Sequence, residues 1–459
     1  MLGQKRRLPL PTVLESLLVA NRGEIARRII RTGNQLGVRT IAVYSEADEK
    51  LPFVTEADEA VLLGPPVPAE SYLNEEAVLA AAKATDAAAV HPGYGFLSEN
   101  ADFAQAVGEA GLIWVGPSPS AMRAMGDKIA ARNRMQAAGV PVAPGSRGPV
   151  ADIEAAFIEA ERIGYPVMVK AAAGGGGIGM SAAHDSGQLR KAFETAKSRA
   201  QRFFSDPAIL LERFVPSARH IEVQILGLAD GTVVALGERD CSVQRRHQKV
   251  AEESPSPAVG PELRASLLAS AVKAGEAVGY RNAGTVEMLF DTASGQAWFL
   301  EMNTRLQVEH PVTEMVTGLD LVEEQLRIAS GMAPTFGAAS PPVAHGHAIE
   351  LRIYAEDPKR FLPGPGTITE WVEPAGDGIR VDSGYRDGNH VTPFYDPLLA
   401  KLIVHGADRD AAVKRAREAV DQFRIAGPKC NLAFFNELLD NAEFVSGVYD
   451  TGIIGRMRP

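Results

Sequence analysis

Five polar side chains that could build a metal or anion site alternate along one short segment: Glu301, Asn303, Arg305, Gln307 and Glu309. In an extended strand successive side chains point to opposite faces, so this spacing predicts that all five lie on one face. Carboxylate and amide oxygens suit Mg²⁺ or Mn²⁺, and such an ion can carry nucleotide phosphates. The segment alone leaves open a solvated strand face on which Arg305 neutralises a glutamate.

A predicted hairpin brings a further carboxylate to this face. Residues 284–290 and 296–301 have strand composition and are separated by 292–295 (TASG), which suits a hairpin turn. Glu287 and Glu301 are equidistant from Ser294, so an unbulged hairpin sets the two carboxylates opposite each other, about 5 Å apart. At an effective dielectric constant of about 20 they repel by roughly 3 kcal/mol. We therefore expect a cation between them.

A run of glycines offers a place for phosphate groups. Gly174, Gly175, Gly176 and Gly177 follow a short predicted strand that ends in Lys170. Consecutive glycines let backbone N–H groups approach an anion closely, and the lysine adds a point charge. A flexible linker is the alternative, although a position between two strands of a compact unit favours the phosphate site. Lys128, in the segment MGDK, is either a second phosphate ligand or a lysine on a helix surface.

Residues 239–249 (RDCSVQRRHQK) gather cations and hydrogen-bonding groups in a chain whose net charge is -10. A solvated run of charge is the default interpretation of such a segment. We interpret residues 252–257 (EESPSP), which follow closely, as a loop that fixes the segment in place. This interpretation argues against a free, solvated face.

Composition indicates the class of protein. The chain has 459 residues, 46% of them hydrophobic and 23% charged, which predicts about two to four domains. The net charge of -10 argues against a general nucleic-acid binder. Cys241 and Cys430 are the only cysteines and form no CxxC motif, and no apolar run approaches the ~20 residues of a membrane span. We therefore expect a cytoplasmic protein with inert thiols and no membrane or nucleic-acid partner.

The N-terminal part alternates strands and helices, which predicts a parallel sheet in an α/β fold. The carboxyl ends of the strands form the ligand edge of such a sheet. Residues 21–24 (NRGE) and 91–100 (HPGYGFLSEN) follow strands directly, but neither is a GxGxxG fingerprint, so dinucleotide binding is not predicted. The predicted strands are 17–20, 40–44, 87–90 and 112–115, and the predicted helices are 24–36, 77–84 and 101–110.

Two further units follow along the chain. Residues 140–145 (VPVAPG) mark a joint, after which a small lid-like unit is predicted. A larger unit runs from about residue 216 to the end and contains the carboxylate hairpin. The predicted elements are strands 165–170 and 208–215 with helix 188–204 in the lid, and strands 221–226 and 233–236 with helix 261–278 in the larger unit.

Five segments together resemble the biotin carboxylase family of the ATP-grasp superfamily. They are 19–25 (VANRGEI), 91–100, 174–177, 238–250 (ERDCSVQRRHQKV) and 301–312 (EMNTRLQVEHPV), and they occur in the family's order. The resemblance covers the chain from about residue 14 to 457 and implies an ATP-grasp fold, α/β (α+β overall), with a small mobile lid. The implied division is a flexible tail at 1–13, an N-terminal α/β domain at 14–127, the lid region at 128–215, the catalytic core at 216–340 and a C-terminal region at 341–459.

The resemblance implies a reaction, in which MgATP and bicarbonate carboxylate the biotin of a carrier through carboxyphosphate, as the first half-reaction of an acyl-CoA carboxylase type enzyme. It implies one or two Mg²⁺ or Mn²⁺ ions at Glu287, Glu301 and Asn303, and ATP contacts from Lys128, Lys170, Gly174, Gly175, Gly176, Gly177, Glu212, Arg213, Val215, His220, Gln244 and His247. It further implies that Lys249, Arg305, Gln307 and Val308 hold bicarbonate, that Glu309 is its general base, and that Arg352 stabilises the biotin enolate near Tyr94.

The biotin is expected to come from elsewhere, because no lysine flanked by methionine, as in biotinylated carriers, occurs in the chain. The resemblance therefore implies a separate carrier protein or domain, a carboxyltransferase subunit and a homodimer. Two other functions stay open: an ATP-grasp ligase that activates bicarbonate for a non-biotin acceptor, and a catalytically silent ATP-binding scaffold. The intact set Glu287, Glu301, Arg305, Glu309 and Arg352 argues against the scaffold.

One position departs from the family pattern. Ile178 follows the fourth glycine, where the family usually has arginine or lysine, so the lid lacks a cation there. We predict that Ile178→Arg lowers the KM for ATP in steady-state kinetics, because a cation at this place strengthens the hold on the triphosphate. Activity is retained in the natural chain because backbone donors remain. An unchanged KM would contradict the prediction.

Overall fold

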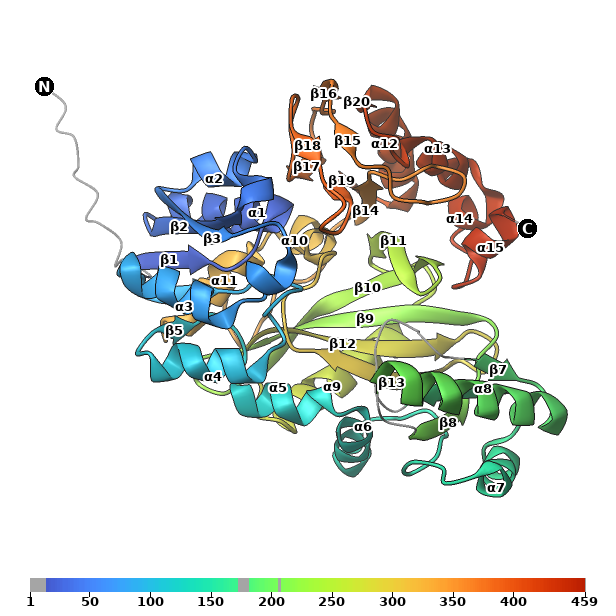
Figure 1. Ribbon diagram of the computed structural model, residues 1–459. Coiled ribbons are helices and arrows are strands. Elements are labelled where there is room, and N and C mark those ends of the chain that lie inside the picture. Colours follow the sequence, from blue (N-terminus) through green and yellow to red (C-terminus); the bar gives the residue numbers. More distant parts are fainter. Residues whose placement is uncertain (1–13, 172–180, 205–207, 459) are drawn as a thin grey trace, which may run out of the picture.

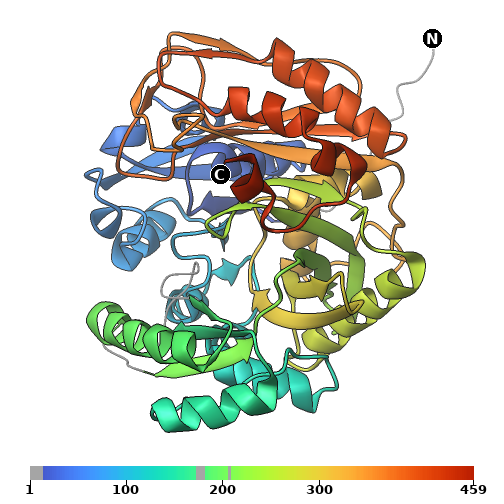
Figure 2. The same ribbon diagram turned by 90° about the vertical axis from the view of Figure 1, so that its right-hand side faces the viewer.

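The computed structural model describes residues 14–171, 181–204 and 208–458 (Figure 1). The predicted tail at 1–13 and the positions Gly174, Gly175, Gly176, Gly177 and Ile178 lie outside the described residues. The described chain forms a large body and a smaller unit, drawn in green at the lower left of Figure 2.

A five-stranded parallel sheet forms the N-terminal part, which confirms the predicted α/β pattern. The loops after β1 and β4, which are neighbours, are tied together because Asn21 Nδ2 donates to the carbonyl oxygens of Pro92 at 2.6 Å and Tyr94 at 2.8 Å. The edge strand β3 was not predicted, because its residues are exposed or half-buried without alternation. The elements are β1 (Ser16–Val19), α1 (Gly23–Gln35), β2 (Arg39–Ser45), α2 (Pro52–Glu56), β3 (Glu59–Gly64), α3 (Glu75–Ala84), β4 (Ala89–His91), α4 (Ala101–Glu109) and β5 (Ile113–Trp114).

The smaller unit is a three-stranded antiparallel sheet covered by two helices. It has a hydrophobic core of its own, in which Val169 and Leu211 of the sheet join Phe193 of the long helix. The strand that carries Lys170 therefore belongs to a unit with few apolar ties to the body, as a lid requires. The elements are α7 (Ile153–Ile163), β6 (Val167–Ala171), β7 (Ser181–Ala183), α8 (Ser186–Phe204) and β8 (Ile209–Arg213).

One eight-stranded sheet forms the body, in the order β13-β12-β9-β10-β11-β14-β19-β17. All its neighbouring strands are antiparallel, and β11 pairs with β14, so the sheet runs without a break across position 340. The strands are β9 (Ala218–Gly227), β10 (Val233–Arg245), β11 (Gln248–Ser254), β12 (Asn282–Asp291), β13 (Gln296–Asn303), β14 (His347–Tyr354), β17 (Ile379–Ser383) and β19 (Leu398–Gly406). The helices around it are α5 (Pro119–Gly126), α6 (Lys128–Ala137), α9 (Pro261–Glu276), α10 (His310–Thr317), α11 (Leu321–Ala329), α12 (Arg409–Gln422), α13 (Leu432–Asp440), α14 (Ala442–Ser446) and α15 (Ile453–Met457).

The predicted loop at 252–257 is wrong at its start. Glu252 and Glu253 lie in β11, which forms a hairpin with β10. The turn of this hairpin falls earlier, at Arg246 and His247, whose φ angles of 50° and 68° are left-handed. The cationic segment is therefore two paired strands around a tight turn. Paired prolines in the sequence suggested a loop two residues too soon.

The carboxylate hairpin has the predicted pairing of Glu287 with Glu301, but the hairpin is bulged. Near the turn Asp291 pairs with Gln296 and Met288 pairs with Phe299, a register that would set Glu287 opposite Leu300. The register shifts between Glu287 and Met288, which leaves Leu300 as the extra residue of a β-bulge. The assumption of an unbulged hairpin was wrong, and the bulge is what brings the two carboxylates onto one face.

The predicted strand over residues 301–309 is also too long. β13 ends at Asn303, and α10 begins at His310 with Pro311 in its first turn. Arg305, Gln307 and Glu309 therefore lie on the connection between the strand and the helix. Leu306 on this connection is fully buried, which turns the polar residues on either side of it away from the core.

The end of the chain closes against the body. Arg219 on β9 is buried, pairs with Asp240 at 2.6 Å and donates hydrogen bonds to the carbonyl oxygens of Gly447 at 3.2 Å and Tyr449 at 2.5 Å. Two residues farther on, the backbone N–H of Thr451 donates to the carbonyl oxygen of Ala218 at 3.0 Å. The last described residues are thus fixed to the strand that carries His220.

The remaining strands are short pairs, and the connection predicted at 331–343 is free of helices and strands. They are β15 (Gly366–Thr367) with β18 (His390–Val391) and β16 (Glu370–Val372) with β20 (Arg424–Ala426), and 3-10 turns lie at Glu46–Asp48 and Pro68–Glu70. Among the described residues, none of the helices is long and apolar enough to cross a lipid bilayer.

Candidate active site

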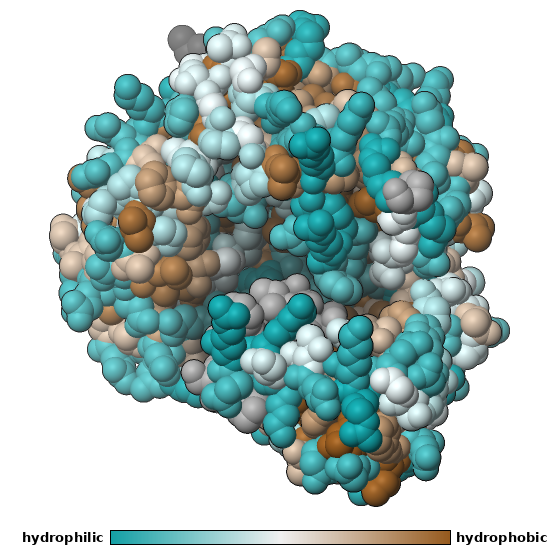
Figure 3. Space-filling view, turned by 45° about the vertical axis from the view of Figure 1, so that its right-hand side comes forward, coloured by the Kyte–Doolittle hydropathy of each residue, from teal (hydrophilic) through white to brown (hydrophobic). Residues whose placement is uncertain are grey.

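A cavity of about 920 Å³ lies where the N-terminal sheet, the lid and the body meet, and Figure 3 shows the hollow at the molecular surface. Every described residue that the sequence analysis assigned to the site lines this cavity. They are Tyr94, Lys128, Lys170, Glu212, Arg213, Val215, His220, Gln244, His247, Lys249, Glu287, Glu301, Asn303, Arg305, Gln307, Val308, Glu309 and Arg352. The structure thus brings together residues from widely separated parts of the chain.

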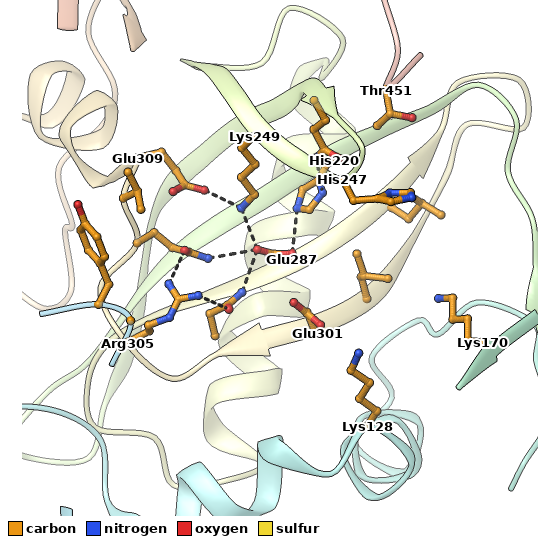
Figure 4. Close-up of a pocket in the computed structure, with 18 of the residues that line it drawn as sticks. Lys128, Lys170, His220, His247, Lys249, Glu287, Glu301, Arg305, Glu309 and Thr451 are labelled. Carbon is orange, nitrogen blue, oxygen red and sulfur yellow. Dashed lines mark hydrogen bonds and ion pairs between the residues drawn. The ribbon is translucent and has the colours of Figure 1, made fainter. Parts of the chain in front are cut away.

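Glu287 is the centre of the site (Figure 4). Its carboxylate accepts hydrogen bonds from Lys249 Nζ at 2.9 Å, Asn303 Nδ2 at 2.9 Å and Gln307 Nε2 at 3.1 Å, and His220 Nε2 lies 3.0 Å away. Burial opposes ionisation, but the charges of Lys249 and His220 outweigh it and hold the pKa of Glu287 well below its ordinary value. Glu287 is therefore a fixed negative charge.

Glu301 stands beside Glu287 in the sheet and has the opposite electrostatic tendency. Burial raises the pKa of Glu301 above its ordinary value, and the neighbouring Glu287 adds to the rise. A divalent ion removes this strain by neutralising both carboxylates, and Asn303 supplies a third oxygen ligand beside them. The donor set of Glu287, Glu301 and Asn303 therefore fits Mg²⁺ or Mn²⁺.

Glu222 extends the row of carboxylates and was not singled out from the sequence. On β9 it pairs directly with Glu287 on β12, which pairs in turn with Glu301 on β13. Its two oxygens contact Lys249 Nζ at 2.6 Å and Arg239 Nε at 2.5 Å. The signal that could have found Glu222 is its alternation with His220 along one strand.

Lys249 joins three carboxylates. Its Nζ atom lies 2.6 Å from Glu222, 2.9 Å from Glu287 and 2.6 Å from Glu309. Burial acts to lower its pKa, but these three negative charges raise the pKa of Lys249 well above its ordinary value. The ammonium group is thus a permanent cation at the middle of the cavity.

Glu309 lies between two cations just before α10. Lys249 Nζ contacts one of its oxygens at 2.6 Å and Arg352 Nη2 contacts the other at 3.0 Å, while the side chain is fully buried. Despite the opposing effect of burial, Lys249 and Arg352 hold the pKa of Glu309 well below its ordinary value. The resting state of Glu309 is therefore a carboxylate, which can accept a proton.

Arg305 is aimed by three neighbours. Its guanidinium donates to Gln307 Oε1 at 2.6 Å and to Asn303 Oδ1 at 3.0 Å, and Glu99 lies 3.0 Å from Nε. Glu99 lies in the segment 91–100, but the sequence analysis assigned it no role. A guanidinium held this way presents its remaining donors to an anion.

The other half of the cavity has the features of a nucleotide site. Lys170 of the lid is ion-paired with Glu212, and Figure 4 shows Lys170 and Lys128 on the same side, across from His220 and His247. Gln244 Nε2 and His220 Nδ1 are hydrogen-bonded at 2.9 Å. The predicted glycine loop lies outside the described residues, so its contribution stays a prediction.

Thr451 reaches this half from the far end of the chain and was missed in the sequence. It lines the cavity near His220 and His247, and its position follows from the anchoring of the chain end to β9. No local pattern marks this threonine as a site residue. Only the tertiary fold brings it there.

The opposite end of the cavity is aromatic. Tyr94, Phe96, Phe394 and Tyr395 line it together with Arg352. The ring of Tyr94 also faces the buried ammonium of Lys401, whose Nζ lies 5.9 Å from the ring centroid. A planar heterocycle with a polar oxygen fits between such rings and a guanidinium.

A lid, a row of acidic residues and two lysines around one cavity define an ATP-grasp enzyme. Three known families match the chain: biotin carboxylase, N-terminal domain, at residues 13–122, the carbamoyl-phosphate synthase L chain ATP binding domain at 127–334, and biotin carboxylase C-terminal domain at 350–456. The first and last name a single family, and the middle match is its ATP-binding part.

Whole proteins agree with these matches. Biotin carboxylase 2 of Bacillus subtilis is 51% identical over 95% of this chain and 98% of its own length. The biotin carboxylase of Halalkalibacterium halodurans is 52% identical over 96% of this chain and 97% of its own. Among solved structures, the Campylobacter jejuni biotin carboxylase-beta-gamma-ATP complex superposes with a TM-score of 0.93 at 44% identity, over 96% of this chain and 99% of that one. The chain therefore belongs to the biotin carboxylase family, and its reaction is the ATP-dependent carboxylation of biotin with bicarbonate.

A second structure shows the same type of site occupied. The biotin carboxylase domain dimer of Hydrogenobacter thermophilus 2-oxoglutarate carboxylase, in complex with MgADP, ADP and bicarbonate, superposes with a TM-score of 0.91 at 42% identity, over 96% of this chain and 97% of that one.

Proposed function

We propose that Glu309 is the general base of this reaction and that Lys249, Arg305 and Arg352 hold its anions. The observation that carries the proposal is the placement of one buried carboxylate between Lys249 at 2.6 Å and Arg352 at 3.0 Å, at the junction of the two halves of the cavity. Bicarbonate is a poor nucleophile, and a base that removes its proton as it attacks the γ-phosphate of ATP supplies what it lacks.

Bicarbonate binding itself activates the base. In the resting site Lys249 and Arg352 hold the pKa of Glu309 well below its ordinary value, which makes Glu309 a weak proton acceptor. A bicarbonate bound at Arg305, Gln307 and the backbone of Val308 shares the hydrogen bonds of Lys249. Glu309 then keeps less of the positive charge, its proton affinity rises, and proton transfer becomes favourable.

The nucleotide occupies the half between the lid and the body. Lys128 and Lys170 contact the phosphates, with the glycine loop at 174–177, while Glu212, Arg213, Val215, His220, Gln244 and His247 lie along the base and ribose. Glu287, Glu301 and Asn303 hold one or two Mg²⁺ or Mn²⁺ ions, which neutralise the triphosphate charge when bound. Closure of the lid excludes water, which would otherwise hydrolyse carboxyphosphate.

Biotin occupies the aromatic end. Carboxyphosphate breaks down to CO₂ and phosphate, the phosphate takes the proton from the ureido nitrogen of biotin, and that nitrogen bonds to CO₂. Arg352 faces the ureido oxygen, where negative charge develops in the enolate, and Tyr94 packs beside the ring. These roles use the residues that the cavity presents between Glu309 and the aromatic side chains.

The test is bicarbonate-dependent ADP release, measured with and without free biotin. We expect release to require bicarbonate and Mg²⁺ and to rise when biotin is added. Stimulation by ammonia with indifference to biotin would contradict this and favour a ligase that activates bicarbonate for another acceptor. Glu309→Gln with unchanged turnover would contradict the role of the base.

We further infer that this chain works in the cytoplasm, as its two free thiols predict, with a biotin carrier and a carboxyltransferase, and as a homodimer. The dimer of the Hydrogenobacter thermophilus domain supports the last point. The chain spans 60% of the length of the methylcrotonoyl-CoA carboxylase subunit alpha of Oryza sativa, which supports an acyl-CoA acceptor. The family matches support the proposed domains at 14–127, 128–215, 216–340 and 341–459.

A further inference from the structure

Glu252 and Glu350 form a buried pair of carboxyl groups that the reaction described above does not use. They are directly opposite each other on the neighbouring antiparallel strands β11 and β14, and both side chains are fully buried. Directly opposed residues of an antiparallel pair place their side chains on the same face, about 5 Å apart.

This pair lies immediately behind Arg352. Arg352 follows Glu350 by two residues on the same strand, so the two side chains share a face. Its Nη2 atom lies 2.5 Å from Glu252 Oε1 and 3.0 Å from Glu309 Oε2. One guanidinium nitrogen is thus shared between the proposed base and a second carboxylate deeper in the protein.

Glu350 has no comparable partner. Neither of its oxygens accepts a hydrogen bond from any residue that the structure describes. The nearest ammonium, that of Lys401, is engaged by the carbonyl oxygen of Val308 at 3.0 Å and by Glu24 at 3.1 Å. An ionised carboxylate buried in this way, beside a second one, is strongly disfavoured.

The ionisation of the pair agrees with this geometry. Burial raises the pKa of Glu252 to about 7, although Arg352 acts to lower it. Burial also raises the pKa of Glu350 well above its ordinary value, and Glu252 adds to the rise while Lys401 opposes it. Two groups that interact this closely titrate as one unit.

We propose that Glu252 and Glu350 share one proton, carried by Glu350, and that ionised Glu252 is a positioning residue that holds Arg352 toward biotin. The proposal rests on the proposed roles of Glu309 and Arg352. When Glu309 takes the proton of bicarbonate, it becomes neutral and loses its hold on Arg352. Glu252 remains as the counter-ion, so the guanidinium stays in place for the enolate oxygen formed in the next step.

Three variants of the full chain test this: Glu350→Gln, Glu252→Gln and the control Glu370→Gln, which alters an exposed glutamate paired with Arg424 at 3.0 Å. Infrared difference spectra of the wild type against each variant at neutral pH report protonated carboxyl groups directly. We expect the Glu350→Gln difference to contain a protonated carboxyl band and the Glu370→Gln difference to contain none.

Kinetics test the positioning role. Glutamine copies a protonated carboxyl group, so Glu350→Gln should keep its melting temperature and its biotin-dependent turnover within about twofold. Glu252→Gln should lower biotin-dependent kcat about tenfold or more. Its KM for ATP and its slow biotin-independent ATP hydrolysis should stay within about twofold, because those steps do not use the Arg352 counter-ion.

Absence of the band from the Glu350→Gln difference would overturn the shared proton, and so would a Glu350→Gln variant that fails to fold. An equal loss of both partial reactions in Glu252→Gln would overturn the positioning role. The infrared result is independent of catalysis, so it stands even if Glu309→Gln shows that the proposed base is wrong.

Discussion

Glu309→Gln is expected to lower bicarbonate-dependent ATP cleavage by about 10²–10⁴-fold, the usual contribution of a general base. Glutamine keeps the shape of the side chain and can still accept hydrogen bonds from Lys249 and Arg352, but it takes no proton at neutral pH. The measurement is ADP release at saturating MgATP and bicarbonate. The loss should appear in kcat, because the nucleotide half of the cavity is unchanged.

The matched control is Glu323→Gln, which alters a glutamate on α11 paired with Arg327 at 3.6 Å, outside the cavity. It should behave as the wild type. Nucleotide binding by the Glu309→Gln variant, measured by calorimetry, should also match the wild type. Turnover within about tenfold of the wild type would show that Glu309 does not act as the base.

Glu287→Gln is expected to weaken magnesium-dependent nucleotide binding by at least about 100-fold, since loss of even an outer partner of a metal ligand costs up to this much. The variant removes one of two adjacent negative charges that a divalent ion would bridge. The fold should survive, because Lys249 keeps its contacts with Glu222 and Glu309. The measurement is isothermal titration calorimetry with ATP, in the presence of Mg²⁺ and in the presence of a chelator.

The chelated experiment is the internal control for Glu287. Metal-free ATP meets Lys128 and Lys170 but no bridging ion, so its affinity should change little in the variant. Glu262→Gln, on the exposed first turn of α9, serves as the control substitution. Equal losses with and without Mg²⁺ would mean that Glu287 orders the site without holding a metal.

Local patterns predicted the elements whose chemistry repeats along the chain. The N-terminal parallel sheet followed from alternating strands and helices, and the pairing of Glu287 with Glu301 followed from the hairpin. The β-bulge at Leu300 could not be predicted, because a bulge is one extra residue without a sequence period of its own. The shared face of Asn303 and Arg305 was wrong in detail, since a helix start at His310 ends the strand early.

The residues that sequence reasoning missed are those whose role depends on distant contacts. Glu222 acts through Lys249 and Arg239 on neighbouring strands, and Glu99 acts through Arg305. Thr451 enters the site only because the chain end is fixed to β9. The family resemblance supplied the roles of Glu309 and Arg352, which composition and spacing alone left open.

The anchoring of the chain end bears on how the enzyme is made. The carbonyl oxygens of Gly447 and Tyr449 satisfy the buried guanidinium of Arg219, and Thr451 completes the wall of the nucleotide half. Synthesis runs from the N-terminus, and its early parts fold while the rest is still being added. The wall of the ATP pocket therefore closes only after the final residues leave the ribosome, so a nascent chain cannot consume ATP before it is whole.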